Sequence, residues 1–486
     1  MAVDGALDMK REESSSISSP HVHKVSSMST NTLEEIFHPQ SIAVVGASDN
    51  PSARGYARTA PLLKHGYQGK IYLVNPKYSE ILGIKAYASI RDIPGPVDYV
   101  ISCVPAPEVL GMLADCSQKG VKTVHLYTAR LSETGRREAI ELEQKILTEA
   151  RNQGIRLIGP NCMGIYYPRQ GMAFNDALPK ESGSVGLVSQ SGQAAEELAR
   201  LASLRGVYFS KAISYGNALD LNECDFLDYL SQDPETKIIL MYVEGVKDGK
   251  RFFNTLRRAA ATKPVIIIKG GRGKSGTRAA ASHTASLAGS MNIWEATVTQ
   301  AGAIPAEDLD ELIDLTVSFY FLPSIKGSRV GVVAEGGGSS VLAADQCEEA
   351  GLDVIALPTE IREELKSKGI PAWDWIGNPA DMSIMLGIDF GVDDMLEIMA
   401  GNQNFDLLIA MMEHRYRGRL KPKGNELKPL LAVMRERSLG SDDYNSWKLM
   451  RQMRKKFIAA NIPFYPTIRR AARSARKLID YYQKRG

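Results

Sequence analysis

A repeated unit of strand, glycine-rich turn and helix constrains the fold of this 486-residue chain more than any other feature. The unit begins at residues 41–48 ("SIAVVGAS"), at 183–202 ("GSVGLVSQSGQAAEELARLA") and at 329–351 ("RVGVVAEGGGSSVLAADQCEEAG"). Further short apolar runs rich in β-branched residues follow each unit, with helix-like segments between them. Strands that alternate with helices predict parallel sheets covered by helices on both faces. The expected fold class is therefore α/β, with three doubly wound parallel-sheet domains.

The spacing of these units predicts the domain organisation, because a chain of this length is too long for one core. Residues 1–32 are rich in serine, mixed in charge and without an apolar stretch, so we expect a disordered tail and no signal peptide. Three α/β domains are expected over 33–165, 166–322 and 329–486. Residues 322–328 ("LPSIKGS") have the composition of a linker.

Composition excludes several classes of protein. The net charge of +3 is spread along the chain and gives no argument for nucleic acid, and the basic tract at 469–477 fits the solvated face of a helix. No apolar run approaches the ~18 residues of a membrane span. No cysteine pair has metal-ligand spacing, which predicts a reducing cytoplasm and no metal site. The cysteines are Cys103, Cys116, Cys162, Cys224 and Cys347.

The turn after the second unit's first strand is the best candidate for binding an anion. Ser189, Gln190, Ser191 and Gly192 would expose backbone N–H groups at a helix N-terminus, and the serines add hydroxyl donors. The alternative is an ordinary N-cap serine without a ligand. A dinucleotide-binding GxGxxG pattern is absent after each of the three opening strands.

Glu244 and His283 are candidates for chemistry. Glu244 ends an apolar strand ("MYVEGV") and is either solvated at the rim of the sheet or directed into a site. His283 stands alone in a stretch of small residues ("AAASHTASLAGS"), where it is either an ordinary loop histidine or a nucleophile. A carboxylate that accepts from Nδ1–H would make Nε2 of an imidazole nucleophilic. Together with the Ser189–Gly192 turn, these two residues could form a site with a nucleophile, its orienting base and an oxyanion cradle.

From about Leu33 onward, over more than nine-tenths of its length, the chain resembles the α subunit of the NDP-forming acyl-CoA synthetases. These are ADP-forming acetate–CoA ligases, related to the α subunit of succinyl-CoA synthetase. The resemblance lies in motifs that are weak singly but specific as an ordered set. They are "VVGAS", "GKIYLVNP", "VDYVISCVPAP", "IGPNCMGI", "GLVSQSGQ", "SYGNALDLNECDFLDYL", "MYVEGVKDGKRFF", "AAASHTASLAGS", "GGGSSVLAADQCEEAGL" and "GNPAD".

The resemblance implies a Rossmann-like domain that binds coenzyme A, followed by two flavodoxin-like ligase domains. It implies that His283 is phosphorylated during turnover, that Glu244 supports it, and that the Ser189–Gly192 turn holds phosphate. Acyl-pocket residues are expected near 193–197. The residues implied in coenzyme A binding are Gly46, Ala47, Ser48, Lys77, Val104 and Pro105.

The implied activity is that of an acid–CoA ligase (NDP-forming), which interconverts acyl-CoA, phosphate and ADP with a carboxylic acid, CoA and ATP. Because the family's ATP-grasp domain has no counterpart here, ATP or ADP with Mg²⁺ would bind to an ATP-grasp β subunit on a separate chain. One alternative is a non-catalytic CoA-binding regulator with the same fold, and another is an enzyme that transfers acyl groups to and from CoA without a nucleotide. The sequence identifies neither the acid nor the nucleotide base.

The chain departs from the family pattern at three places. Ala285 replaces a glycine of the usual "SHTGSLAG", and Glu335 falls within the usual "TNGGG". Arg130 falls where many members have "AGF.E". These changes could affect the histidine loop, docking on the nucleotide side and CoA contacts, but none removes an implied catalytic group.

Overall fold

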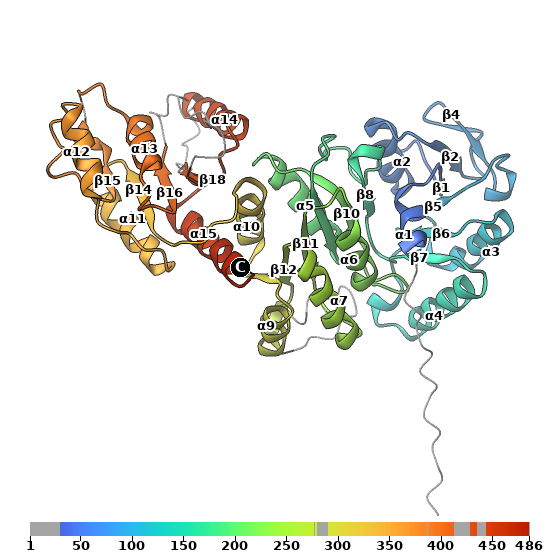
Figure 1. The fold of residues 1–486 in the computed structure, drawn as a ribbon. Helices are drawn as coiled ribbons and strands as arrows, with labels where there is room; N and C mark the ends of the chain where they lie inside the picture. Colours follow the sequence, from blue (N-terminus) through green and yellow to red (C-terminus); the bar gives the residue numbers. More distant parts are fainter. Residues whose placement is uncertain are drawn as a thin grey trace, which may run out of the picture.

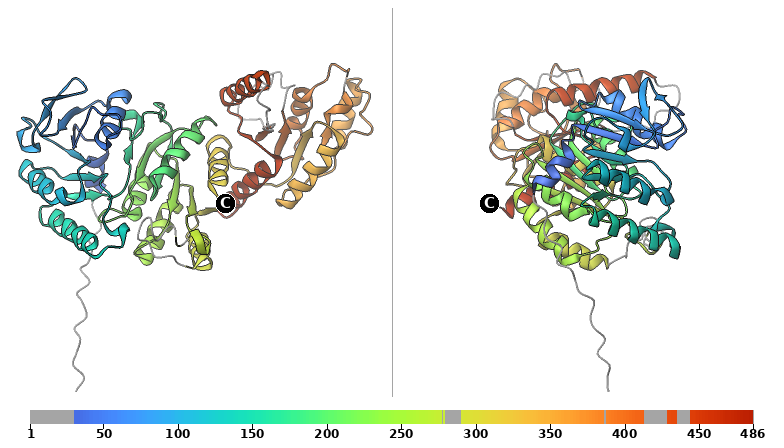
Figure 2. Two further views of the ribbon diagram at one scale, coloured as in Figure 1. Left: turned by 180° about the vertical axis from the view of Figure 1, so that it is seen from behind. Right: turned by 90° about the vertical axis from the view of Figure 1, so that its right-hand side faces the viewer.

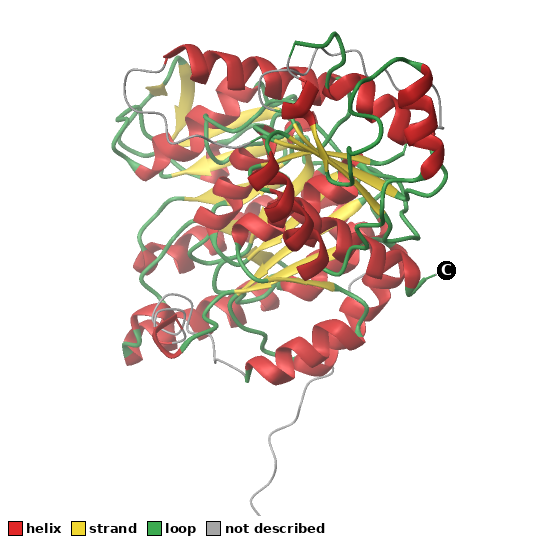
Figure 3. Ribbon diagram, turned by 90° about the vertical axis from the view of Figure 1, so that its left-hand side faces the viewer, coloured by secondary structure: helices red, strands yellow, loops and turns green. Residues whose placement is uncertain are grey.

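The structure, a computed structural model, describes residues 30–276, 278, 290–385, 387–412, 428–434 and 444–485. Three sheets follow one another along the chain, and the second lies between the first and the third (Figures 1 and 2). Helices enclose the strands of these sheets (Figure 3), as expected for doubly wound α/β domains. Residues 279–289, which include His283, lie outside the described residues, and so do residues 1–29 of the predicted tail.

The first sheet has the order β3-β4-β2-β1-β5-β6-β7, and all its neighbours are parallel except β3 and β4. All five residues of its central strand β1 are buried, as is usual where helices cover both faces of a sheet. The strands are β1 (Ser41–Val45), β2 (Lys70–Val74), β3 (Glu80–Ile81), β4 (Ile84–Tyr87), β5 (Tyr99–Ser102), β6 (Thr123–Leu126) and β7 (Arg156–Ile158), and the helices of this part are α1 (Thr30–Phe37), α2 (Arg54–His65), α3 (Val109–Lys119) and α4 (Arg137–Asn152).

The second sheet has the order β13-β12-β11-β9-β10-β8 and is parallel except for β8, which runs antiparallel to β10. β8 lies across the expected boundary between 165 and 166, and its pairing assigns it to this sheet. The strands are β8 (Gly164–Tyr166), β9 (Val185–Ser189), β10 (Phe209–Ser214), β11 (Ile238–Val243), β12 (Val265–Lys269) and β13 (Ile304–Ala306), and the helices are α5 (Gly192–Ser203), α6 (Glu223–Gln232), α7 (Gly249–Thr262), α9 (Met291–Gln300) and α10 (Leu309–Phe321).

The third sheet has the order β15-β14-β16-β17-β18, and every pairing is parallel. The three sheets confirm the predicted fold class. The strands are β14 (Val330–Ala334), β15 (Ala380–Asp381), β16 (Leu407–Met411), β17 (Leu430–Val433) and β18 (Phe464–Tyr465), and the helices are α11 (Gly337–Glu349), α12 (Thr359–Ser367), α13 (Val392–Gly401), α14 (Tyr444–Ala459) and α15 (Ile468–Gln483). None of the helices in the described ranges is long and apolar enough to cross a membrane.

The basic tract at 469–477 lies on α15, as the sequence predicts a helix there. Its side chains form ion pairs with neighbouring helices instead of only facing solvent. Arg469 pairs with Glu349 on α11 at 2.5 Å, and Lys477 pairs with Glu311 on α10 at 2.6 Å. The tract therefore joins the second and third domains.

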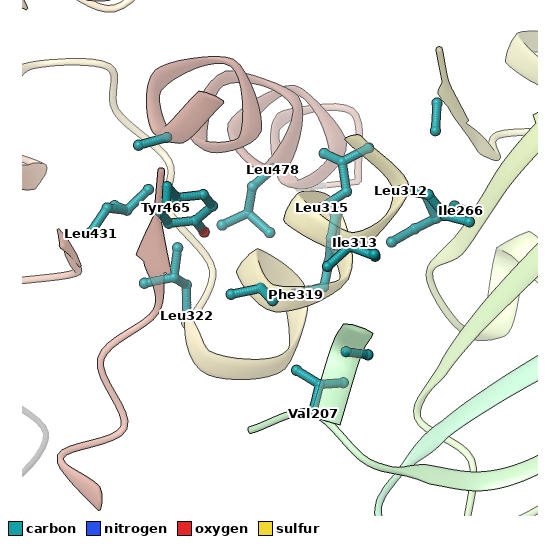
Figure 4. Close-up of a cluster of buried hydrophobic side chains, with 14 of the residues drawn as sticks. Val207, Ile266, Leu312, Ile313, Leu315, Phe319, Leu322, Leu431, Tyr465 and Leu478 are labelled. Atoms are coloured by element: carbon teal, nitrogen blue, oxygen red, sulfur yellow. The ribbon is translucent and has the colours of Figure 1, made fainter. Parts of the chain in front are cut away.

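One continuous apolar cluster lies between the second and third domains (Figure 4). Leu312 and Phe319 of α10 contribute from one side, and Leu478 of α15 contributes from the other. The Tyr465 hydroxyl, at the end of β18, lies 2.7 Å from the hydroxyl of Ser318 in the same region. Burying each leucine or phenylalanine side chain stabilises the folded state by about 1.5–3 kcal/mol, so this cluster holds the two domains together.

Truncation of this cluster is expected to destabilise the chain. Leu312 is 0% exposed, so Leu312→Ala should lower the free energy of unfolding by about 2–5 kcal/mol. Leu204→Ala, at a leucine that is 48% exposed, is the control and should change it by about 0.5 kcal/mol or less. Urea denaturation followed by circular dichroism measures both variants. Equal losses in the two variants would contradict the assignment of Leu312 to the core.

Candidate active site

The carboxyl ends of β9, β10 and β11 meet at one edge of the second sheet, because these three strands are parallel. β9 ends at Ser189, β10 ends at Ser214, and Glu244 follows the end of β11. Ligands of open α/β sheets bind at this edge. The sequence candidates Ser189–Gly192 and Glu244 therefore lie on adjacent strands at the edge where a substrate would bind.

The Ser189–Gly192 turn leads directly into α5. The Ser189 hydroxyl donates to the Ser191 carbonyl at 2.6 Å, and the Ser191 side chain caps α5 by accepting from Ala194 N–H at 3.3 Å. Gly192 is required for packing, because a Cβ there would lie 2.3 Å from Cγ of Met163. The first N–H groups of a helix have no intrahelical partners, so this helix start can bind an anion as well as carry its cap.

Gln190 connects this turn to β11. Its side-chain Oε1 accepts from the backbone N–H groups of Glu244 at 2.8 Å and Gly245 at 3.1 Å. Its own backbone N–H donates to the Tyr242 carbonyl at 2.9 Å. Gln190 is only 4% exposed, so these contacts fix the backbone of Glu244 relative to the turn. The sequence grouped Gln190 with the phosphate-binding residues and gave no sign of this second role.

Glu244 is only 7% exposed, which excludes the alternative of a carboxylate solvated at the rim. Burial and the hydrogen bond and charge of Glu244 raise the pKa of Tyr242 to about 12. Lys269, at the end of β12, donates to the backbone carbonyl of Glu244 and, at 2.7 Å, to that of Gly270. Burial lowers the pKa of Lys269, and the negative charge of Glu244 opposes that shift. The structure thus holds Glu244 in an apolar, hydrogen-bonded setting.

A second buried carboxyl group, which sequence reasoning missed, lies in the same domain. Glu223 begins α6 and is 4% exposed, and burial raises its pKa to about 7 while the positive charge of Lys247 opposes the shift. The pKa of the buried Tyr215 is raised by burial and by the charges of Glu223 and Glu244. The only signal for Glu223 in the sequence was its position in the "NECDFLDYL" motif.

His283 lies outside the described residues, so its distance to Glu244 is not part of the structure. β12 is the last strand before His283, and it ends at Lys269. This strand pairs with β11, so that Lys269 lies opposite Val243. Gly270 lies against Glu244, since a Cβ there would be 3.1 Å from Cγ of Glu244. The chain therefore leaves the sheet toward His283 from a point beside Glu244.

The expected coenzyme A turn lies at the carboxyl edge of the first sheet. Gly46 has φ +82°, and a Cβ there would lie 3.3 Å from the Cys103 carbonyl carbon. The Asn75 side chain donates to the Ala47 carbonyl at 2.8 Å, and the Ser48 hydroxyl accepts from Asn50 N–H at 3.1 Å. Lys77 is exposed beyond the end of β2. These contacts bring the predicted residues 46–48 and 77 to one end of the sheet.

A cavity of about 630 Å³ opens beside this turn. Pro105 lines it, whereas the Val104 side chain is buried in the domain core and its carbonyl accepts from the Thr128 hydroxyl at 2.8 Å. The other lining residues are Arg54, Cys103, Ala106, Pro107, Ala129, Arg130, Arg136, Glu138, Ala139 and Leu142. The volume lies within the range of about 300–1,000 Å³ that is usual for ligand sites.

Three arginines give this cavity a positive lining that fits a phosphorylated ligand such as coenzyme A. Arg54 and Arg136 were not predicted as site residues, and Arg130 was noted only as a departure from the family pattern. Arg130 has φ +72°, and Leu131 N–H, next to it, donates to the Glu133 carboxylate at 3.1 Å. Arg54 is the first residue of α2, the helix that follows the Gly46–Ser48 turn, and this position could have identified it as a site residue.

Direct contacts between the first and second domains connect the carboxyl edge of the first sheet with the carboxyl edge of the second sheet. The Glu133 carboxylate of the first domain accepts from the Asn217 side chain of the second domain at 2.9 Å, and the Asn217 backbone N–H donates to the Pro160 carbonyl at 3.0 Å. Within the second domain, Lys247 Nζ holds this segment by donating to the carbonyls of Asn217 at 3.0 Å and Ala218 at 2.8 Å. Across the described residues, no group of three His, Cys, Asp or Glu side chains is arranged to hold a metal ion.

Close packing at the coenzyme A turn predicts a strong effect of one added methyl group. A Cβ on Gly55 would lie 2.0 Å from the Gly46 carbonyl oxygen, so Gly55→Ala must move α2 or the turn. Overpacking costs about 1–3 kcal/mol, so we expect coenzyme A to bind roughly tenfold more weakly or worse. Gly111→Ala in α3, where a Cβ meets nothing within 4 Å, is the control. Calorimetric titration with coenzyme A measures both, and unchanged affinity in Gly55→Ala would place the ligand elsewhere.

Comparisons with known proteins agree with this geometry. Residues 40–168 match the family model of the CoA binding domain, and residues 182–319 match that of the succinyl-CoA ligase like flavodoxin domain. The α subunit of acetate–CoA ligase [ADP-forming] II from Pyrococcus furiosus is 39% identical over 381 residues, which cover 78% of this chain and 82% of that subunit. This chain belongs to the α subunits of the ADP-forming acyl-CoA synthetases.

Other ADP-forming acyl-CoA synthetases give the same result. Acetate–CoA ligase [ADP-forming] from Methanocaldococcus jannaschii is 39% identical over 352 residues, which cover 72% of this chain and 49% of that protein. This chain thus spans about half the length of that relative. A solved structure titled dinucleotide forming acetyl-coenzyme A synthetase 1 from Ca. Korarchaeum cryptofilum, in complex with phosphate and ADP, has a TM-score of 0.77 and 31% identity, covering 93% of this chain and 97% of that one.

Membership in the ADP-forming acyl-CoA synthetases confirms several sequence predictions. The chain is an acid–thiol ligase α subunit that works with coenzyme A and a nucleotide, and its relatives do not support the regulator alternative. The name α subunit also implies a partner subunit. The two family models confirm the predicted CoA-binding domain and one flavodoxin-like ligase domain, whereas the second flavodoxin-like ligase domain, expected over 329–486, remains a prediction.

Proposed function

We propose that this α subunit forms an acyl phosphate from acyl-CoA and phosphate and passes the phosphoryl group to His283. Orthophosphate held at the Ser189–Gly192 turn would attack the thioester carbonyl, which gives the acyl phosphate and free CoA–SH. Nε2 of His283 would then attack phosphorus, and the carboxylic acid would leave. The observation that carries this proposal is the buried Glu244, whose backbone Gln190 ties to the turn.

Glu244 would accept a hydrogen bond from Nδ1–H of His283 and stabilise the positive charge of the phosphoimidazole. A carboxylate with 7% exposure is screened little by water, so its effect on a nearby cation is strong. His283 lies five residues after Arg278, the last described residue before it. We propose that the segment carrying His283 serves Glu244 and a second site in turn.

The second site would be on an ATP-grasp β subunit, where Mg²⁺ with ADP or ATP exchanges the phosphoryl group with His283. Relatives of the chain are named α subunits, which supports a partner on a separate chain. Their names include acetate, 4-hydroxybutyrate and trans-feruloyl-CoA, so the family does not fix the acid. We propose a small carboxylic acid as substrate and the cytoplasm as the compartment.

Labelling of the chain from both directions tests this function. The purified chain is incubated with ³²P-phosphate and a panel of aliphatic and aromatic acyl-CoAs, and separately with γ-³²P-ATP, Mg²⁺ and an ATP-grasp subunit from the same cell. Both reactions should give acid-labile, base-stable label in the peptide that contains His283. ATP without the second subunit should give none. Absence of label in both reactions would support the regulator instead.

A further inference from the structure

A buried arginine, Arg58, lies between the coenzyme A turn and the phosphate turn. It belongs to α2, the helix that follows the Gly46–Ser48 turn, and is 5% exposed. Its Nη1 donates to the Met163 carbonyl at 3.3 Å and contacts the Met163 sulfur at 3.5 Å. Met163 N–H in turn donates to the Ser214 hydroxyl at 3.1 Å, at the carboxyl end of β10. Arg58 therefore spans the boundary between the first and second domains.

The contacts of Met163 connect Arg58 to the phosphate turn. A Cβ on Gly192 would lie 2.3 Å from Cγ of Met163, so Met163 packs directly on this turn. On the other side, the helix that carries Arg58 packs on the coenzyme A turn, since a Cβ on Gly55 would lie 2.0 Å from the Gly46 carbonyl oxygen. The guanidinium thus lies between the site expected for coenzyme A and the site expected for phosphate.

Arg58 has few partners for a buried cation. Its guanidinium stacks on the Tyr127 ring at 4.4 Å, and its buried Nε has no hydrogen-bond partner among the described residues. No carboxylate in the described part of the chain forms an ion pair with it, although the charge of Glu196 on α5 acts on it from a distance. Burial lowers the pKa of Arg58, yet guanidinium groups stay protonated in proteins. A buried charge without a paired anion is costly unless a ligand supplies one.

We propose that Arg58 is an anion-binding residue of the acyl site, where it binds the acyl phosphate that forms between the two domains. This inference rests on the proposed function, because the thioester end of CoA must meet the phosphate turn at the boundary that Arg58 occupies. Glu196 lies in the segment 193–197, where the acyl pocket is expected. Arg58 would supply positive charge to the phosphoryl oxygens, and α5 would supply backbone N–H groups.

Two substitutions separate an anion-binding role from a structural one. Arg58→Gln keeps a donor for the Met163 carbonyl but loses the charge, whereas Arg58→Lys keeps the charge. The two labelling reactions described above also separate the acyl step from the nucleotide step. In Arg58→Gln, label from acyl-CoA and ³²P-phosphate should form about 10²-fold more slowly, while label from γ-³²P-ATP and the second subunit should stay within about threefold.

Arg58→Lys should retain acyl-dependent labelling within about tenfold, since it keeps the cation but loses the planar donor geometry. Arg205→Gln is the matched control. Arg205 is a half-buried arginine at the boundary of the second and third domains, where it pairs with Asp314 at 3.0 Å. Arg470 also pairs with Asp314, so the loss of Arg205 leaves that carboxylate a partner and should leave both reactions within about threefold.

Each remaining outcome contradicts the proposal in a recognisable way. Wild-type rates of acyl-dependent labelling in Arg58→Gln would make Arg58 a structural contact. Equal losses in both reactions would indicate damage to the fold. A wild-type chain that is labelled by ATP but by none of the acyl-CoAs has no acyl site of this kind, which overturns the inference and keeps the phosphohistidine. A chain labelled by neither reagent contradicts the proposed function itself.

Discussion

His283→Ala is expected to abolish the formation of acid from acyl-CoA, because it removes the nitrogen that accepts the phosphoryl group. Coenzyme A should still bind within about threefold of the wild-type affinity, since the turn at Gly46 and the cavity beside it belong to another domain. Steady-state assays of acid release and calorimetric titration with coenzyme A measure the two effects.

The matched control for this change is His23→Ala, in the segment that the sequence predicts to be a disordered tail. This variant should keep both activity and coenzyme A affinity. Synthetase activity that survives in His283→Ala would rule out the phosphohistidine. Loss of coenzyme A binding together with activity would instead indicate a change of fold.

Glu244→Gln should slow phosphohistidine formation by roughly 10²-fold or more, because the amide keeps the shape and an acceptor atom but loses the charge. The backbone should stay in place, since Gln190 holds the backbone N–H of residue 244 and not its side chain. Rapid-quench measurement of ³²P-labelled protein gives the rate directly.

Glu307→Gln is the control for Glu244→Gln. Glu307 lies after β13 on the same sheet, and its side chain is exposed, so the rate should not change. If Glu244→Gln labels at the wild-type rate, the buried carboxylate has a structural role and the ring of His283 is stabilised by another group.

The sequence was sufficient for features that depend on local pattern. Apolar β-branched runs predicted the opening strands β1, β9 and β14, and the glycine-rich turns after them predicted the starts of the helices that follow. The position of Glu244 after a strand placed it at the carboxyl edge of the sheet, but only the structure shows that it is buried. Burial depends on neighbours such as Lys269, which is 25 positions away in the sequence and contacts Glu244 only in the folded sheet.

Features that depend on contacts between distant residues could not be predicted. β8 reverses direction and pairs with β10 almost fifty residues later, which no local propensity indicates. The side chain of Gln190 reaches Glu244, 54 positions along the chain, and Arg58 reaches Met163, 105 positions away. Glutamine and arginine are normally surface residues, so their burial has no signature in the sequence.

The packing of α15 against α10 has a consequence for how the chain folds during synthesis. Ser318 and Tyr465 lie 147 positions apart, so the apolar side of α10 stays uncovered until residues beyond 465 leave the ribosome. At about 5–20 residues per second this interval lasts several seconds or longer. The first two domains can form during that time, but they carry an apolar surface that is available to chaperones or to other nascent chains. Translation pauses within residues 322–465 should therefore increase aggregation more than pauses earlier in the message.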